Sequence, residues 1–123
     1  MRQPPAIPQL DPLYADLRRH DPVRPALVVD VREADEYASV RVEGSFHVPS
    51  SQFARRATEI PRDRPVVVMC ASGSRSAAVT DHLLNNGWTD VGNVAGGIVA
   101  WERFGLPVRR GTPDPGEGTL PEG

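Results

Sequence analysis

The sequence has only one cysteine, Cys70, among its 123 residues, and its charges nearly cancel. A single cysteine excludes an internal disulfide and a zinc site built from several cysteines. The formal net charge of −2, with 24% charged residues, provides no basic surface for nucleic acid. We therefore expect no nucleic-acid partner, and a lone thiol whose surroundings decide its role.

Long hydrophobic runs are also missing. No apolar stretch approaches the roughly 20 residues that a membrane-spanning helix needs. The first residues lack the cationic and apolar segments of a signal peptide. We expect a cytoplasmic protein without a membrane partner, which suits a reactive thiol, and the length is that of one domain with its own core.

Cys70 comes at the end of a short, unbroken apolar run. Residues 65–69, Pro-Val-Val-Val-Met, are rich in β-branched side chains without alternation, which predicts a strand buried on both faces. Residues 76–86 show apolar positions at helical spacing, and Gly87 is a plausible helix stop. Cys70 is thus expected where a buried strand ends and a helix begins.

This position has chemical consequences for the thiol. Backbone N–H groups of a tight strand-to-helix turn converge on one point, and the helix N-terminus adds a partial charge of roughly +0.5. A thiol among such donors is stabilised as a thiolate, with a pKa below the free value of about 8.5. A lone cysteine is also often a small buried hydrophobe. The Ser-Gly-Ser-Arg-Ser sequence that follows Cys70 favours a nucleophile in an anion-binding loop.

The rest of the chain alternates between apolar strands and amphipathic helices. In the first helix, Leu13, Tyr14 and Leu17 mark one apolar face. Short strands are predicted around residues 6–10, 26–31, 45–48 and 91–94, and helices around residues 12–20, 50–60 and 97–104. Strands separated by helices predict an α/β domain with a mainly parallel sheet.

Four segments carry motifs in a fixed order. Residues 27–33 read Leu-Val-Val-Asp-Val-Arg-Glu, residues 36–37 read Glu-Tyr, and residues 44–49 read Gly-Ser-Phe-His-Val-Pro. Residues 70–76 read Cys-Ala-Ser-Gly-Ser-Arg-Ser, and residues 94–108 contain Val-Ala-Gly-Gly-Ile-Val-Ala-Trp and Gly-Leu-Pro-Val. In this order they resemble an internal strand with its helix, a Gly-Ala-x-x-Ile-Pro segment, the active-site loop and the C-terminal signature of the rhodanese-like family of single-domain sulfurtransferases.

The resemblance implies a three-layer α/β/α fold with a five-stranded, mainly parallel sheet. The strands would follow the order 1-5-4-2-3, which places the strand before Cys70 centrally. The domain would cover residues 1–108, with residues 1–10 as a proline-rich lead-in that adds at most a short edge strand. Residues 109–123 lack apolar periodicity and are rich in Gly and Pro, so we expect a disordered tail.

The same resemblance implies a sulfurtransferase with Cys70 as its catalytic residue. The thiolate would take the outer sulfur of a small donor such as thiosulfate or a persulfide, forming a Cys70 persulfide, and cyanide, a thiol or a protein thiol would then accept that sulfur. No metal or organic cofactor is required. The loop that binds the anion or persulfide would consist of Ala71, Ser72, Gly73, Ser74, Arg75 and Ser76.

Asp30 and Arg32 are candidate supporting residues, because sites gather at the carboxyl ends of parallel strands. The resemblance places Asp30 near the cysteine loop, with hydrogen bonds to loop or neighbouring backbone donors. We expect Arg32 to form an ion pair with Glu36 or another acid. A structural role is favoured for both residues.

Two alternatives stay open. A carrier or partner-binding module would hold sulfur without multiple turnover, and an intact cysteine does not distinguish it from an enzyme. Phosphatases and arsenate reductases on the same fold place five residues between the cysteine and the arginine. Four residues separate Cys70 from Arg75, which disfavours that alternative. The sequence leaves the physiological donor, the acceptor and the oligomeric state open.

Overall fold

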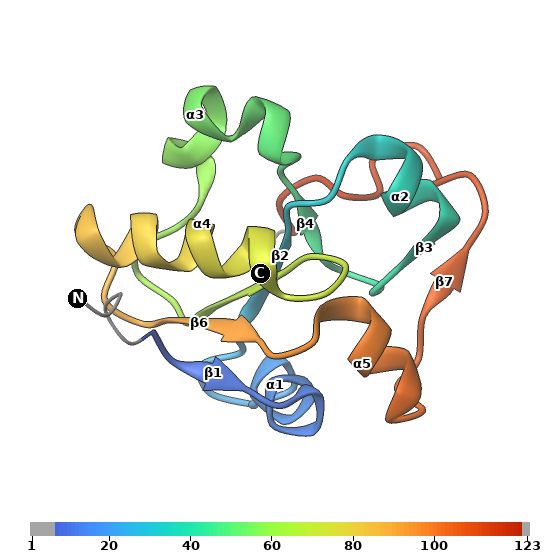
Figure 1. Cartoon of the computed structure of the whole chain (residues 1–123), viewed down its shortest axis with the longest axis horizontal. Helices are drawn as coiled ribbons and strands as arrows, with labels where there is room; N and C mark the ends of the chain where they lie inside the picture. The colour runs from blue at the N-terminus through green and yellow to red at the C-terminus, as the bar shows by residue number, and fades with distance from the viewer. Residues whose placement is uncertain (1–6, 122–123) are drawn as a thin grey trace, which may run out of the picture.

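Five parallel strands form the central sheet of the computed structural model, which describes residues 7–121 (Figure 1). The sheet order is β1-β6-β5-β2-β4, which is 1-5-4-2-3 when the five strands are numbered in chain order, as the family resemblance implied. The strands are β1 (Gln9–Leu10), β2 (Leu27–Asp30), β4 (Phe46–His47), β5 (Val66–Met69) and β6 (Val91–Val94). β5 is therefore central, and its carboxyl end leads into Cys70. Residues 1–6 of the predicted lead-in lie outside the described residues.

Helices cover both faces of the sheet, which confirms the three-layer α/β/α fold. The helices are α1 (Pro12–Arg19), α2 (Ala34–Ser39), α3 (Phe53–Arg56), α4 (Ser74–Asn85) and α5 (Gly97–Arg103), and 3-10 turns at Ser50–Gln52 and Ala57–Glu59 flank α3. Side chains of α3 and α4 join one apolar cluster, and side chains of α1 and α5 join the other. The predicted helix over residues 50–60 is thus broken into three short pieces.

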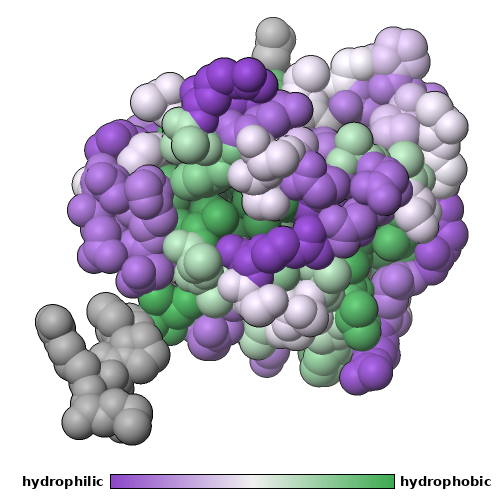
Figure 2. Space-filling view, turned by 45° about the horizontal axis from the view of Figure 1, so that its top comes forward, coloured by the Kyte–Doolittle hydropathy of each residue, from purple (hydrophilic) through white to green (hydrophobic). Residues whose placement is uncertain are grey.

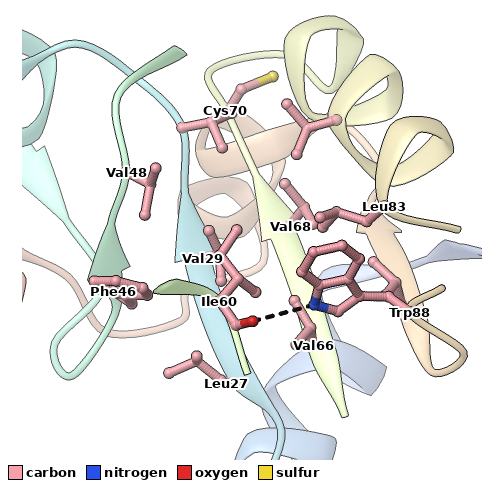
Figure 3. Close-up of a cluster of buried hydrophobic side chains, with 13 residues drawn as sticks. Leu27, Val29, Phe46, Val48, Ile60, Val66, Val68, Cys70, Leu83 and Trp88 are labelled. Carbon is pink, nitrogen blue, oxygen red and sulfur yellow. Dashed lines mark hydrogen bonds between the residues drawn. The ribbon is translucent and has the colours of Figure 1, made fainter. Parts of the chain in front are cut away.

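The two clusters explain the apolar run before Cys70. Successive β5 side chains alternate between them: Val66 and Val68 face the α4 side, and Val67 and Met69 face the α5 side. All four side chains are buried, which explains why every position of β5 carries an apolar residue. Figure 3 shows Cys70 at the end of this strand, continuing the α4-side cluster with its sulfur beyond the packed side chains.

The apolar face of α1 differs from the expectation. Leu13, Tyr14 and Leu17 are exposed, and the helix buries Pro12 and Ala15 instead. The small Ala15 side chain belongs to the cluster that contains α5, so α1 packs closely there without a large apolar residue. The Asp11 carboxylate caps α1 by accepting a hydrogen bond from Tyr14 N–H at 2.8 Å.

The segment predicted as a disordered tail is also different, because residues 109–121 dock on the domain. β7 (Arg109–Arg110) pairs antiparallel with β3 (Val40–Arg41). The Glu117 carboxylate forms a salt bridge with the Arg41 guanidinium, which is 1% exposed. Farther along, Gly118 C=O accepts a hydrogen bond from His47 N–H at 2.8 Å, at the outer edge of β4. Polar contacts hold this segment, so apolar periodicity could not reveal its docking.

A hollow opens between α3 and α4. Phe53, Ala54, Ala78, Val79 and His82 line a pocket of about 430 Å³. Figure 2, turned so that the top of Figure 1 comes forward, shows hydrophobic surface in a hollow between hydrophilic groups. The pocket lining contains no cysteine, serine or threonine. No helix among residues 7–121 is both long and apolar enough to cross a membrane.

Candidate active site

The Cys70 thiol lies inside the turn that joins β5 to α4. Its Sγ accepts hydrogen bonds from Gly73 N–H at 3.0 Å and from the Ser76 hydroxyl at 3.2 Å. Gly73 adopts φ +105°, a left-handed conformation that favours glycine, and it caps the N-terminus of α4. The turn therefore folds back far enough for one of its own amides to reach the sulfur.

Two opposing effects set the acidity of this thiol. Burial raises the pKa of Cys70, because a charged thiolate is less favourable away from water. Hydrogen bonds from the Ser76 hydroxyl and from the N–H groups of Ser76, Gly73 and Ser72 lower the pKa. The hydrogen bonds outweigh burial, so the pKa lies below its ordinary value and the thiolate is favoured.

The start of α5 orients the peptide groups of the loop. Ile98 N–H donates to Cys70 C=O at 2.9 Å, and Val99 N–H donates to Ala71 C=O at 3.2 Å. In a trans peptide the C=O and the following N–H point in opposite directions. Holding Ala71 C=O against α5 thus turns the next N–H, that of Ser72, away from α5, which accounts for its contribution at the sulfur.

Two residues outside the loop complete this support. The sequence suggested that the Gly96-Gly97 turn helps to shape the wall of the site, but it did not assign Asn93 to the site. A Cβ on Gly97 would lie 2.4 Å from Cys70 C=O and 2.5 Å from Ala71 C=O, so only glycine fits there. Asn93 Nδ2 donates to Gly73 C=O at 3.2 Å. Asparagine within a buried strand, near its carboxyl end, is the sequence signal that points to this position.

The loop cation, Arg75, is held by Glu36 of α2. Its two terminal nitrogens donate to the two carboxylate oxygens of Glu36 at 2.7 and 2.8 Å. These hydrogen bonds lower the pKa of Glu36 to about 2 and raise the pKa of Arg75. Arg32 was expected to pair with Glu36 or another acid, and Glu36 pairs with Arg75.

Arg32 takes Asp30 as its acid instead. Asp30 is fully buried and accepts from Arg32 Nη2 at 2.7 Å and from Arg32 N–H at 2.9 Å. The guanidinium also donates to Glu36 C=O at 3.0 Å and to Val40 C=O at 2.6 Å. Asp30 pairs in register with Met69, the residue before Cys70. The Asp30–Arg32 pair therefore braces the β2 side of the site and α2.

The other two serines of the loop lie at the surface of the protein. Ser72 and Ser74 are exposed, whereas Cys70 is 0% exposed. The described residues 7–121 contain no group of three or more His, Cys, Asp or Glu side chains placed to hold a metal ion.

Known proteins with similar sequences and structures fit this geometry. A family model for the Rhodanese-like domain matches residues 10–104. A sulfurtransferase of Allochromatium vinosum is 40% identical over 82 residues, which cover 67% of this chain and 77% of the relative. The thiosulfate sulfurtransferase GlpE of Actinobacillus succinogenes is 32% identical over 83 residues, covering 68% and 75%. The crystal structure of a rhodanese-related protein from Thermoplasma volcanium superposes with a TM-score of 0.72 at 30% identity, covering 83% of this chain and 97% of that one.

The chain belongs to the rhodanese-like domain family, and it is an enzyme of the sulfurtransferase type.

Proposed function

We propose that this protein transfers sulfane sulfur from a small donor to a thiophilic acceptor through a persulfide on Cys70. The observation that carries the proposal is the convergence of a backbone amide and a hydroxyl on Cys70 Sγ, at 3.0 and 3.2 Å. Such donors stabilise a thiolate before the reaction, and they stabilise the persulfide anion that the thiolate becomes.

In the first step the Cys70 thiolate attacks the outer sulfur of the donor. A new S–S bond forms to Sγ, and the S–S bond of the donor breaks. The leaving group departs with that electron pair, as sulfite from thiosulfate or as a thiolate from a persulfide. The enzyme then carries one additional sulfur, covalently bound.

In the second step an external nucleophile attacks the outer sulfur of the Cys70 persulfide, and the Cys70 thiolate leaves. Cyanide yields thiocyanate, and a thiol yields a new persulfide. Cys70 is the only cysteine of the chain, so no second thiol of this chain can resolve the persulfide as a disulfide. The acceptor must come from outside.

The narrow turn favours sulfur over phosphate as the transferred group. Donors at 3.0 and 3.2 Å from Sγ surround the thiol closely, and four residues separate Cys70 from Arg75. A phosphoryl group would need further donors at about 2.7–3.1 Å for each of three oxygens. We therefore expect negligible hydrolysis of aryl phosphates.

Steady-state assays test this proposal. The wild type should form thiocyanate from a sulfur donor and cyanide over many turnovers, while Cys70→Ser should form none, because a serine hydroxyl is not ionised at neutral pH. One equivalent of thiocyanate followed by arrest would indicate a sulfur carrier instead of an enzyme. Hydrolysis of an aryl phosphate faster than thiocyanate formation would contradict the proposal.

A further inference from the structure

We infer that the sulfur donor of this site is a persulfide with an uncharged organic group, in preference to the thiosulfate dianion. The inference rests on the proposed sulfur transfer at Cys70. It follows from the charges around the thiolate: each cation that the site provides is already matched by a carboxylate.

Arg75 is the only charged side chain between residues 70 and 76. Both of its terminal nitrogens are engaged by Glu36, at 2.7 and 2.8 Å. Figure 1 shows the turn before α4 beyond the end of the central strand, in the part of the molecule that also contains α2, the helix that carries Glu36. The pair as a whole is neutral, so it offers an approaching anion no net charge.

The other arginine beside the loop is also occupied. The Arg32 guanidinium is 2% exposed and bonded to the carboxylate of Asp30 and to backbone C=O groups of Glu36 and Val40. It cannot turn toward a donor without leaving a buried carboxylate unpaired, which is strongly unfavourable. Arg32 therefore adds no free positive charge at the thiolate.

The flank toward α2 is acidic. Glu33 caps this helix and Asp35 lies in its first turn, and both precede Glu36. Hydrogen bonds from Ser51 and Ser50 lower the pKa of Glu33, so its carboxylate stays ionised at neutral pH. The start of α2 therefore contributes carboxylates and no cation beside the Arg75–Glu36 pair.

The backbone donors around Sγ are matched to one negative charge. They hold the thiolate before transfer and the persulfide anion after it. Thiosulfate brings two further charges, most of which lie on the oxygens of the departing sulfite and require their own cation. A persulfide with an uncharged organic group, R–S–SH, brings at most one charge. Its outer sulfur bonds to Sγ, its S–S bond breaks, and RS⁻ leaves with that electron pair and takes up the proton that the new Cys70 persulfide releases.

The test compares two donors with cyanide as the acceptor, thiosulfate and 2-hydroxyethyl persulfide, in three variants. Glu36→Gln frees the Arg75 charge, Arg75→Gln leaves the Glu36 charge alone, and Glu59→Gln removes an acid that pairs with Arg56 on the 3-10 turn after α3. The readout is the ratio of kcat/KM for thiosulfate to kcat/KM for the persulfide. A general loss of loop order would lower kcat/KM for both donors, so it would leave this ratio unchanged.

In the wild type, kcat/KM for the persulfide should be at least tenfold higher than kcat/KM for thiosulfate. One unit of charge about 6 Å from a dianion in a water-like dielectric corresponds to roughly tenfold in rate. Glu36→Gln should therefore raise the ratio about tenfold, Arg75→Gln should lower it, and Glu59→Gln should leave it within twofold. The differences should shrink in 1 M salt.

An equal or higher efficiency with thiosulfate in the wild type would overturn the inference while sulfur transfer at Cys70 stands. A ratio that does not rise in Glu36→Gln would overturn it as well. If neither donor places sulfur on Cys70, the proposed function itself fails, and the inference fails with it.

Discussion

Ser76 is the side chain whose loss should change the Cys70 thiol most. Its hydroxyl donates to Sγ at 3.2 Å, and the Ser76 side chain is fully buried, so water cannot take its place. The Thr80 hydroxyl donates to Ser76 C=O at 2.8 Å and fixes this first turn of α4. The hydroxyl of Ser76 is the leading hydrogen bond that offsets the effect of burial on the pKa.

Ser76→Ala should raise the pKa of the Cys70 thiol, since burial then acts against fewer hydrogen bonds. The pH dependence of alkylation by iodoacetamide measures this: the wild-type midpoint should lie below the free-thiol value of about 8.5, and the variant midpoint should lie above that of the wild type. Alkylation at pH 7 should be several-fold slower in the variant. Ser72→Ala is the matched control, because Ser72 contributes through its N–H, which the substitution keeps. Equal midpoints in all three proteins would show that the hydroxyl is irrelevant.

Glu36 should make stability depend on acid pH. The Arg75 guanidinium lowers the pKa of Glu36 from an ordinary 4.5 to about 2 in the folded protein. A lowered pKa means that folding favours the ionised form, so this stabilisation is complete above about pH 4.5 and disappears as the pH falls toward 2. Both side chains are about one-third exposed, so the effect is modest and screened by salt.

Urea unfolding of the wild type and Glu36→Gln at pH 6, 4 and 2.5 measures this contribution. The wild type should be more stable at pH 6, and the gap should narrow at pH 4 and nearly close at pH 2.5. A gap of constant size across this range would show that the pair does not stabilise the fold through ionisation.

At the scale of elements, the close approach of α5 to the loop determines the direction of the loop amides. Gly97 has φ +59°, and a side chain there would collide with Cys70 C=O and Ala71 C=O. Gly105, at the other end of α5, has a similar φ of +75° but nothing within 4 Å of a Cβ. Alanine at either position would strain the backbone, but only alanine at Gly97 would also displace the loop. Comparing the two substitutions therefore distinguishes the two effects.

Gly105→Ala should cost about 1–2 kcal/mol of unfolding free energy, the usual penalty for alanine in a left-handed conformation, and should keep the rate of sulfur transfer. Gly97→Ala should cost more and should lower kcat at least tenfold, because the loop must shift away from α5. Denaturant unfolding and the thiocyanate assay measure the two effects. Similar behaviour of both variants would contradict the role assigned to α5.

Elements that carry a local pattern could be predicted from the sequence. The buried strand β5 and the helix after Cys70 both agree with the structure. The strand order also agrees, but it came from the family resemblance and not from a local pattern. The β3–β7 pair could not be predicted, because its strands are two residues long and about 70 positions apart. α1 was assigned the wrong buried face because its three largest apolar side chains gave the only pattern, whereas the structure packs Ala15 against α5.

The site also has a part that could be predicted from the sequence and a part that could not. The stretch from Cys70 to Ser76 could be recognised as one loop, since its residues are adjacent in sequence. Glu36, Asn93 and Gly97 reach that loop from α2, β6 and α5. Their contacts depend on how these elements pack, and no spacing in the sequence encodes that packing.

At the scale of the whole molecule, the C-terminal segment closes one edge of the sheet. Gly118 C=O covers the His47 N–H that β4 would otherwise expose, which blocks pairing with another chain. Glu117 neutralises the buried Arg41 guanidinium, and Gly111 C=O accepts from the same group at 2.6 Å. Residues 109–121 therefore belong to the stable fold.

Glu117→Gln should cost about 3 kcal/mol of unfolding free energy, because it leaves the charge of Arg41 buried and unpaired. Deletion of residues 111–123 should lower the melting temperature by roughly 10 °C or more. Asp114→Asn is the control: its carboxylate meets only Arg109 at the surface, at 3.2 Å, and its loss should change stability by less than about 0.5 kcal/mol. A truncated protein that melts at the wild-type temperature would show that the segment contributes nothing.

The mass of the intact protein tests the central claim most directly. After treatment with a sulfur donor and removal of the excess, the wild type should gain about 32 Da, one sulfur atom, located on Cys70. Cyanide should then restore the original mass and release one equivalent of thiocyanate, and Cys70→Ser should gain nothing. A wild type that gains no sulfur on Cys70, or a serine variant that gains the same mass, would contradict sulfur transfer through this residue.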